Sequence, residues 1–281
     1  MPSKSKPPKA ISLLGIPLDM NSTYLRGAAE APPRIREALR CDSSNLWTED
    51  GVDLGHGDVI HDCGDLELPS APEAAAKAIE HAVARTLQLG HPLISLGGDH
   101  SITYPILRGF HSRFPNLTIL HFDAHPDLYD NLCGRLSHAT PFARIMEERL
   151  ARRLVQVGIR TLNQHQHEQA KRFGVEIISM RNFGKAPRLK VKGPLYISLD
   201  IDVLDPAFAP GISHYEPGGM SVREVLNVIQ SVRALIVGAD IVEYNPVRDR
   251  EDQTAMVAGK FLKEIAAAML RGGRAPKTGW A

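Results

Sequence analysis

The sequence predicts an α/β fold built on a central, mostly parallel sheet. Its apolar runs are about five to seven residues long and do not alternate with polar residues, which is typical of strands covered on both faces. Segments of helical periodicity separate these runs, as expected where crossover helices connect parallel strands. Several runs end in Asp or His, and ligands of such sheets bind at the carboxyl ends of the strands. We therefore expect a functional site at that edge of the sheet.

The first part of the chain is expected to contribute both strands and helices. Pro32 and Pro33 begin a helix, because proline is favoured in the first helical turn. Ile79, Val83 and Leu87 recur every four residues, which indicates an amphipathic helix packed on the sheet. The expected elements are an apolar run at 11–16, a helix at 32–40, a strand within 59–66, a helix at 72–89 and a strand at 92–97.

The rest of the chain alternates between apolar runs and segments with one apolar helical face. Two long polar segments, 42–58 and 203–219, are expected to be surface loops. The predicted strands cover 117–123, 154–159, 175–179, 194–200 and 235–242. The predicted helices cover 101–113, 139–150, 166–173, 221–233 and 253–270. No composition shift marks a second domain, so we expect a single catalytic domain over residues 1–281, with residues 1–9 as a disordered tail.

Composition and charge exclude several classes of function. The net charge is +1 with no basic block beyond the short N-terminal tail, which argues against nucleic acid and membrane surfaces as partners. No apolar run approaches the ~20 residues of a membrane span. The three cysteines are odd in number and lack metal-type spacing, which indicates reduced thiols in a cytoplasmic protein.

The apolar run at 117–122 leads into three metal-ligand types at alternate positions. Asp123, His125 and Asp127 converge on one side of an extended backbone, because successive side chains alternate faces. Burying carboxylates beside apolar residues is unfavourable unless a cation or hydrogen-bond donors offset the lost hydration. Taken alone, the segment is compatible with either a polar turn or a metal site.

Two further strand ends favour the metal site. One apolar run ends before His100, and another ends in Asp200 and Asp202. Two imidazoles and four carboxylates are too many ligands for one ion but suit two. Two divalent ions about 3.5–4 Å apart can share a water and lower its pKa toward neutrality. An oxygen-rich ligand set favours manganese over zinc, although nickel and cobalt also fit.

Three motifs resemble the signatures of the ureohydrolase (arginase/agmatinase) family. They are Gly97–Ser101, Asp123–Asp127 and Ser198–Pro206, and the similarity extends from about Ile11 to Arg271. Three other segments resemble plant-type arginases in particular. These are Ser137–Glu147, Pro210–Gly219 and Gly238–Pro246.

The resemblance implies a three-layer α/β/α fold, two Mn²⁺ ions and release of urea from a guanidinium group. It implies that a hydroxide bridging the two ions attacks the guanidinium carbon, with Asp127 then passing a proton to the leaving amine. The resemblance assigns the metal ligands as follows: His100, Asp123, Asp127 and Asp202 to one ion, His125 and Asp200 to the other, with Asp123, Asp127 and Asp202 bridging.

The resemblance also points to residues around the substrate. His138 corresponds to a histidine assigned to proton shuttling, and Glu243 to a glutamate that receives the guanidinium. Each has a structural alternative, since His138 could cap the following helix and Glu243 could form a salt bridge at its strand end. His214 is expected to line the substrate mouth, and Arg160 or Asn163 to meet the far end of the substrate.

Three remaining residues near the motifs are given other roles. Asp99 and Asp205 either orient neighbouring ligands or simply complete turns. His121 is expected to point away from the ligands and to pack in the core.

The substrate and assembly are less sharply defined by these residues. The resemblance favours L-arginine, hydrolysed to L-ornithine and urea, with agmatine as the alternative and guanidinobutyrate or guanidine behind it. Two other classes are considered: a one-ion zinc amidohydrolase, and a metal-stabilised partner subunit without activity. The complete ligand set argues against both. Members of the family usually form homotrimers or homohexamers, and the segment from residue 253 onward is a candidate interface.

Overall fold

The sheet is the centre of the fold. The computed structural model describes residues 8–130, 136–184, 191 and 193–274, so residues 1–7 of the expected tail lie outside it. Within the described residues one eight-stranded sheet is formed. Its strands are β1 (Ile11–Ile16), β2 (Ile60–Asp65), β3 (Leu93–Gly97), β4 (Thr118–Phe122), β5 (Arg153–Val157), β6 (Glu176–Ile178), β7 (Pro194–Asp200) and β8 (Leu235–Val242).

The order of the strands brings distant parts of the chain together. The order is β2-β1-β3-β8-β7-β4-β5-β6, and every pair of neighbours is parallel. The prediction of a parallel sheet is thereby confirmed. The last two strands, β7 and β8, insert between β3 and β4, so the carboxyl ends of these four strands lie side by side at the middle of the sheet.

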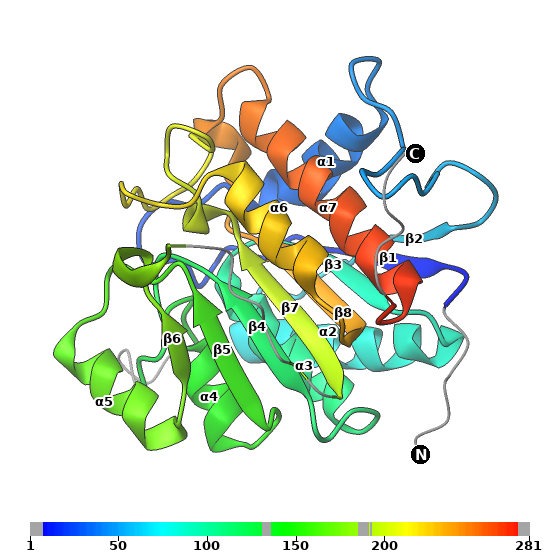
Figure 1. Cartoon of the computed structure of the whole chain (residues 1–281). Coiled ribbons are helices and arrows are strands. Elements are labelled where there is room, and N and C mark those ends of the chain that lie inside the picture. The colour runs from blue at the N-terminus through cyan, green and yellow to red at the C-terminus, as the bar shows by residue number, and fades with distance from the viewer. Residues whose placement is uncertain (1–7, 131–135, 185–190, 192, 275–281) are drawn as a thin grey trace.

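Helices cover both faces of the sheet and complete three layers (Figure 1). One face carries α1 (Ala31–Arg40), α6 (Val222–Ser231) and α7 (Gln253–Arg271), which share an apolar cluster with the sheet. The other face carries α2 (Pro72–Thr86), α3 (Thr103–His111), α4 (Pro141–Glu147) and α5 (Gln164–Phe173). Strands buried on both faces explain why the apolar runs show no alternation.

Two helices differ from their predicted bounds for local reasons. The segment predicted as a helix from 101 begins as a 3₁₀ turn, His100–Ile102, which continues into α3. The helix α4 is shorter than the predicted 139–150, because the chain reaches the left-handed region at Arg149, where φ is 56°. The helix α7 packs on α1 and α6 and buries most of its apolar residues within the subunit.

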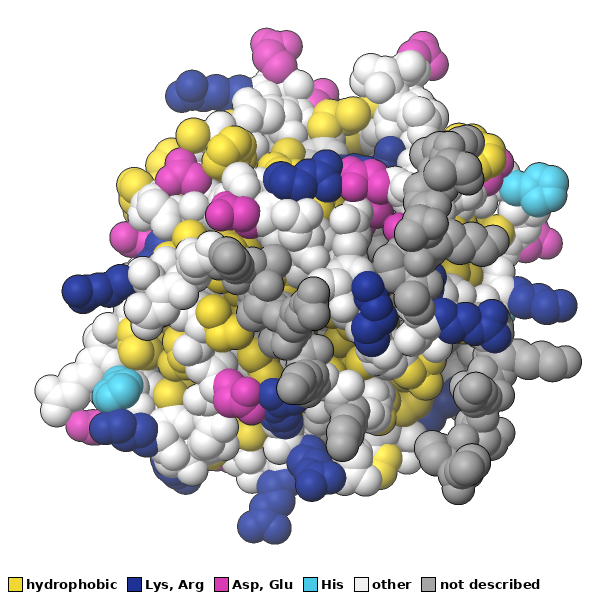
Figure 2. Space-filling view, viewed as in Figure 1, with side chains coloured by type: hydrophobic (Ala, Val, Ile, Leu, Met, Phe, Trp, Pro, Cys, Tyr) yellow, Lys and Arg dark blue, Asp and Glu magenta, His cyan; other side chains and the backbone are white. Residues whose placement is uncertain are grey.

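The surface agrees with the small net charge. On the face that carries α6 and α7, acidic and basic side chains are interspersed (Figure 2). In the part of the chain that the structure describes, no helix is long and apolar enough to cross a membrane. Of the three cysteines, Cys41 and Cys63 are free thiols, and Cys133 lies outside the described residues.

Candidate metal centre

The predicted ligands gather at the carboxyl ends of three of the four central strands. Asp123 follows β4, His100 follows β3, and Asp200 ends β7. Glycine is required just before His100, because a Cβ at Gly98 would overlap the backbone of Leu18. The close approach of these two backbones lets the N–H of Asp99 donate to the Leu18 carbonyl oxygen, at 2.7 Å.

The His100 imidazole lies at the centre of the first ligand group. Its Nδ1 is 3.1 Å from one oxygen each of Asp123, Asp127 and Asp200. Its Nε2 is 3.0 Å from the hydroxyl of Ser198. Ser198 in turn donates its proton to Asp240, at 2.7 Å, so its oxygen is left to accept from Nε2–H of the imidazole.

This arrangement fixes the neutral His100 ring as the tautomer with its lone pair on Nδ1. That nitrogen is buried and makes no hydrogen bond. Burial opposes a charge on His100, but the three facing carboxylates raise its pKa, so they favour a positive charge here, either a proton on Nδ1 or a metal ion. One imidazole nitrogen with several carboxylate oxygens is a suitable donor set for a divalent ion.

The second ligand group is centred on His125. Its Nδ1 lies 2.9 Å from Asp202 Oδ2 and 3.4 Å from Asp123 Oδ1. Asp123 therefore turns one oxygen toward each group and stands between them. All six predicted ligands are brought together in this way.

The division of the last two ligands differs from the predicted one. Asp200 lies beside His100, whereas the resemblance assigned it to the ion of His125, and Asp202 lies beside His125, as a bridging ligand could. The chain enters a 3₁₀ turn, Ile201–Val203, directly after β7, and the turn carries Asp202 to the other side of Asp123.

The carboxylates of the centre lack enough positive charge of their own. Burial, and then repulsion from Asp123, raises the pKa of Asp127 to about 6. Burial, followed by neighbouring carboxylates, also raises the pKa of Asp200 and of Asp202. Crowded carboxylates of this kind ionise at neutral pH when cations lie between them. The donor set and its charge thus fit a pair of divalent ions.

A cavity of about 210 Å³ opens onto the centre. The side chains of Asp127, Asp200, Asp202 and His125 form part of its wall. Glu243 also lines it, and its backbone is held in the left-handed region at φ 62°. Asp127 shares this conformation, with φ 49°. Such conformations cost about 1–3 kcal/mol for residues other than glycine and cluster at functional sites.

Glu243 and His138 form a pair in the cavity wall. His138 Nδ1 lies 2.9 Å from Glu243 Oε1, which also accepts a hydrogen bond from the N–H of His100. The N–H of Thr23 donates to His138 Nε2, at 3.2 Å, and its hydroxyl lies 2.8 Å from the same nitrogen. The N-cap of α4 is Thr140, so His138 does not cap that helix.

The surroundings of His138 provide partners for both of its charge states. Burial lowers the pKa of His138, but the nearby Glu243 carboxylate outweighs burial and raises it to about 9. The Thr23 N–H favours the neutral ring, whereas the Thr23 hydroxyl can accept a hydrogen bond from Nε2–H of the charged ring. Thr23 therefore offers the ring a hydrogen-bond partner in either charge state.

The residues expected at the far end of the substrate are placed differently. His214 lines the cavity, 5.1 Å from the His138 ring centre. Arg160 is not among the cavity residues: its guanidinium donates to the carbonyl oxygens of Asp202, Leu204 and Glu216, among others. Asn163 is not among the described cavity residues either: it caps α5 by accepting from the N–H of Gln166, and its Nδ2 lies 2.6 Å from the Tyr129 hydroxyl.

The sequence does not predict several residues of the site, and it predicts the wrong orientation for one. His121 was expected to point away, but its Nε2 lies 2.8 Å from Asp123 Oδ2. It stands two positions before Asp123, so the alternation that aligns the later ligands already places it on their side. Thr23, Tyr129 and Gln166 also line or support the cavity, and their positions carry no strand-end signal. Asp99 and Asp205 accept hydrogen bonds within turns.

The comparison with known proteins agrees with this geometry. The arginase family model matches residues 9–268. The chain is 50% identical over 275 residues to "Arginase 1, mitochondrial" of Arabidopsis thaliana, covering 91% of this chain and 80% of that protein. It is 32% identical over 269 residues to the agmatinase of Bacillus subtilis, covering 92% and 91%. The arginase structure from Medicago truncatula superposes with a TM-score of 0.87 at 44% identity, covering 93% and 88%.

The expected cytoplasmic location is wrong on this comparison. The Arabidopsis relative just described is mitochondrial by name, and a second arginase of that plant, 47% identical over 277 residues (92% and 80%), is named chloroplastic/mitochondrial. These relatives point to an organelle. Free cysteines indicate a reducing environment, which does not by itself distinguish between compartments.

Proposed function

The chain belongs to the arginase family of ureohydrolases, and from this premise we propose that it hydrolyses L-arginine to L-ornithine and urea. The observation that carries the proposal is the pair of ligand groups sharing Asp123, which opens into a cavity lined by Glu243. The Arabidopsis relative named arginase is 50% identical to this chain, whereas the Bacillus subtilis relative named agmatinase is 32% identical. The whole chain would act as one catalytic domain.

We propose two Mn²⁺ ions as the cofactor. His100, Asp123, Asp127 and Asp200 would hold one, and His125, Asp123 and Asp202 the other. When bound, such a pair supplies a water that is nucleophilic at neutral pH and polarises the substrate. The oxygen-rich donor set supports manganese, with nickel or cobalt as chemically suitable replacements.

The side chains around the cavity have separate roles in the proposal. The Glu243 carboxylate receives the guanidinium, a planar cation that can donate two parallel hydrogen bonds. Asp127 would accept a proton from the attacking water and transfer it to the leaving amine as the C–N bond breaks. His138, held by Glu243 and Thr23, exchanges protons between the cavity and solvent. His214 forms part of the cavity wall on the same side.

Agmatine is the second candidate, because the described cavity wall has no cationic side chain to bind the α-carboxylate of arginine. Arginine and agmatine share the guanidinium group and differ by the α-carboxylate. Among the described residues lining the cavity there is no Lys or Arg, and Arg160 is engaged by backbone carbonyls. An α-carboxylate would therefore be met by neutral groups such as the Tyr129 hydroxyl and the Gln166 amide.

Urea release by the Mn²⁺-loaded protein tests the proposal. Arginine, agmatine, 4-guanidinobutyrate and guanidine are compared at equal concentration, with Asp200→Asn as the inactive control. A kcat/KM for arginine at least about tenfold above that for agmatine would support the proposal. The opposite order would assign the chain to agmatinases, and no urea from any substrate would refute a ureohydrolase activity.

A second measurement addresses assembly, which we propose to be a homotrimer or homohexamer. Light scattering on the full chain would give the mass directly, and a monomer would contradict the proposal. The interior packing of α7 against α1 and α6 argues that surfaces other than the apolar face of α7 form the interface.

A further inference from the structure

A row of buried polar side chains crosses the sheet just inside the metal centre. In register, Asp240 of β8 pairs with Ser198 of β7, Ser198 with His121 of β4, and His121 with Gln156 of β5. All four side chains are fully buried. Burying polar side chains costs free energy unless they are hydrogen-bonded. One half of the row, Ser198 and Asp240, holds His100, and the other half has no role in the proposed function.

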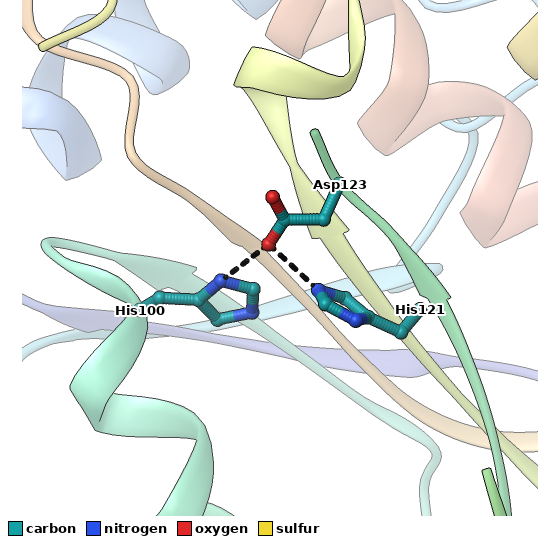
Figure 3. A group of neighbouring side chains, drawn as sticks. All are labelled: His100, His121 and Asp123. Atoms are coloured by element: carbon teal, nitrogen blue, oxygen red, sulfur yellow. Dashed lines mark hydrogen bonds and ion pairs between the residues drawn. The ribbon is translucent and has the colours of Figure 1, made fainter. Parts of the chain in front are cut away.

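His121 makes a hydrogen bond with both of its ring nitrogens. Its Nε2 lies 2.8 Å from Asp123 Oδ2, the oxygen that faces His100 (Figure 3). Its Nδ1 lies 3.0 Å from Gln156 Nε2. The ring also packs against Phe142, with ring centres 3.9 Å apart. Hydrogen bonds at both ring nitrogens and packing of the ring against Phe142 thus hold His121 in place.

The Gln156 amide decides which nitrogen of His121 carries the proton. Gln156 Nε2 donates to the carbonyl oxygen of Pro126, at 2.6 Å. A flipped amide would place oxygen against oxygen there, so the NH₂ group must face both Pro126 and His121 Nδ1. Because an N–H points at Nδ1, that nitrogen accepts, and the ring proton resides on Nε2, where it is donated to Asp123.

We propose that His121, with its tautomer set by Gln156, is a positioning residue that holds Asp123 between the two ligand groups. The other Asp123 oxygen accepts from the N–H of His125, at 2.5 Å, so both carboxylate oxygens are anchored. The same geometry excludes His121 as a metal ligand, although its nitrogen lies close enough to the site. A protonated Nε2 has no lone pair to offer an ion.

The inference rests on the proposed metal centre but not on the choice of substrate. Hydrogen-bond partners of metal ligands fix ligand orientation, and their loss weakens metal binding by roughly 10–100-fold. Pro126 lies between His125 and Asp127, so Gln156 also ties the ligand-bearing loop to β5. Loss of either side chain should therefore weaken metal binding while leaving the fold intact.

Mn²⁺ binding by the full chain tests the proposal without reference to activity. Ions per chain are counted by elemental analysis, affinity is measured by competition with a chelator, and the metal-free melting temperature reports folding. His121→Phe removes the N–H donor, whereas His121→Gln keeps one. Gln156→Glu preserves size but accepts from Nδ1–H, which reverses the tautomer. The matched control is Gln169→Glu, at a buried glutamine on α5 that is not among the described residues lining the cavity.

The expected result is two ions in the unaltered protein, and roughly 10–100-fold weaker binding in His121→Phe and Gln156→Glu. His121→Gln should lose less affinity, and Gln169→Glu should bind as the unaltered protein does. Unchanged Mn²⁺ affinity in both Gln156→Glu and His121→Phe would overturn the positioning role of His121 and leave the metal centre in place. A third ion that is lost in His121→Phe would make His121 a ligand and overturn it as well. No ion in the unaltered protein would refute the metal centre itself, and the inference with it.

Discussion

Two clusters of acidic side chains in this protein differ in their surroundings. In the metal centre, the carboxylates of Asp123, Asp127, Asp200 and Asp202 surround the imidazoles of His100 and His125. The second cluster, which we term the brace, joins the loop 42–58 to α6 and α7. It consists of Glu49, Arg223, Gln230, Lys260 and Glu264.

The brace satisfies its own charges. Both oxygens of Glu49 accept from Arg223, at 2.8 Å, and the arginine, together with Gln230 and Lys260, holds the pKa of Glu49 well below its usual range. The fully buried Glu264 accepts from Lys260, at 2.7 Å, and from the N–H of Glu49, at 2.9 Å. Two carboxylates therefore meet two cations.

The difference separates a structural cluster from a functional one. A balanced set of charges needs nothing from outside and contributes to stability. The metal centre places four carboxylates around two imidazoles and raises the pKa of several of its acids, so it is completed only by added cations. Buried acidic residues alone indicate neither role, and the partner groups decide between them.

The largest effect should come from Asp127→Asn, which tests the functional side of the comparison. The amide cannot pass a proton to the leaving amine, and loss of a general acid typically costs 10²–10⁴-fold. We expect kcat for urea release to fall at least about 100-fold. Asp205→Asn, in a partly exposed turn, is the control and should keep full activity. An Asp127→Asn enzyme with full turnover would contradict the assigned role.

Removal of metal should separate the two clusters by stability. Ions that bind only the folded state add about 2.7 kcal/mol at 100 times their dissociation constant. Chelation should therefore lower the melting temperature of the unaltered protein. Asp200→Asn should lose this dependence on Mn²⁺, and Glu264→Gln should retain it. If the brace variant also lost the dependence, the two clusters would be coupled and the distinction would fail.

The ligands could be predicted from the sequence because they stand at strand ends. Buried parallel strands read as continuous apolar runs, and their carboxyl ends must share one edge of the sheet. His100, Asp123 and Asp200 needed only this information to be placed together. The same reasoning covers Glu243, which follows β8.

The remaining features depend on contacts that local patterns do not contain. The partition of Asp200 and Asp202 follows from a 3₁₀ turn, which a list of ligands does not reveal. Arg160 has the charge to bind a carboxylate, but the path of the loop 203–219 brings carbonyl oxygens to its guanidinium. Thr23 reaches His138 from 115 positions away, in a loop without periodicity.

Glu264→Ala should have the next largest effect, on stability alone. It leaves the N–H of Glu49 without its acceptor and removes one of the two carboxylates that the Lys260 ammonium contacts. Because Lys260 remains partly exposed to solvent, we expect a loss of about 1–3 kcal/mol in the free energy of unfolding, measured with denaturant. The kcat of the folded variant should be unchanged. A large loss of activity at full folding would show that the brace acts on the centre.

The smallest effect should be the coupling between Glu49 and Arg223 within the brace. Both side chains are partly exposed, so a double-mutant cycle with Glu49→Gln and Arg223→Met should give about 1 kcal/mol or less at pH 7. The pKa of Glu49 is lowered in the folded protein, so its contribution is present above the unfolded value, about 4.3, and is lost as the pH falls toward the folded one. The coupling should therefore be flat from pH 8 to about 5, and should decrease only below that range. A coupling that already declined between pH 7 and 6, where Asp127 titrates in the metal-free centre, would mean that the brace senses the charge of the centre and is not self-contained.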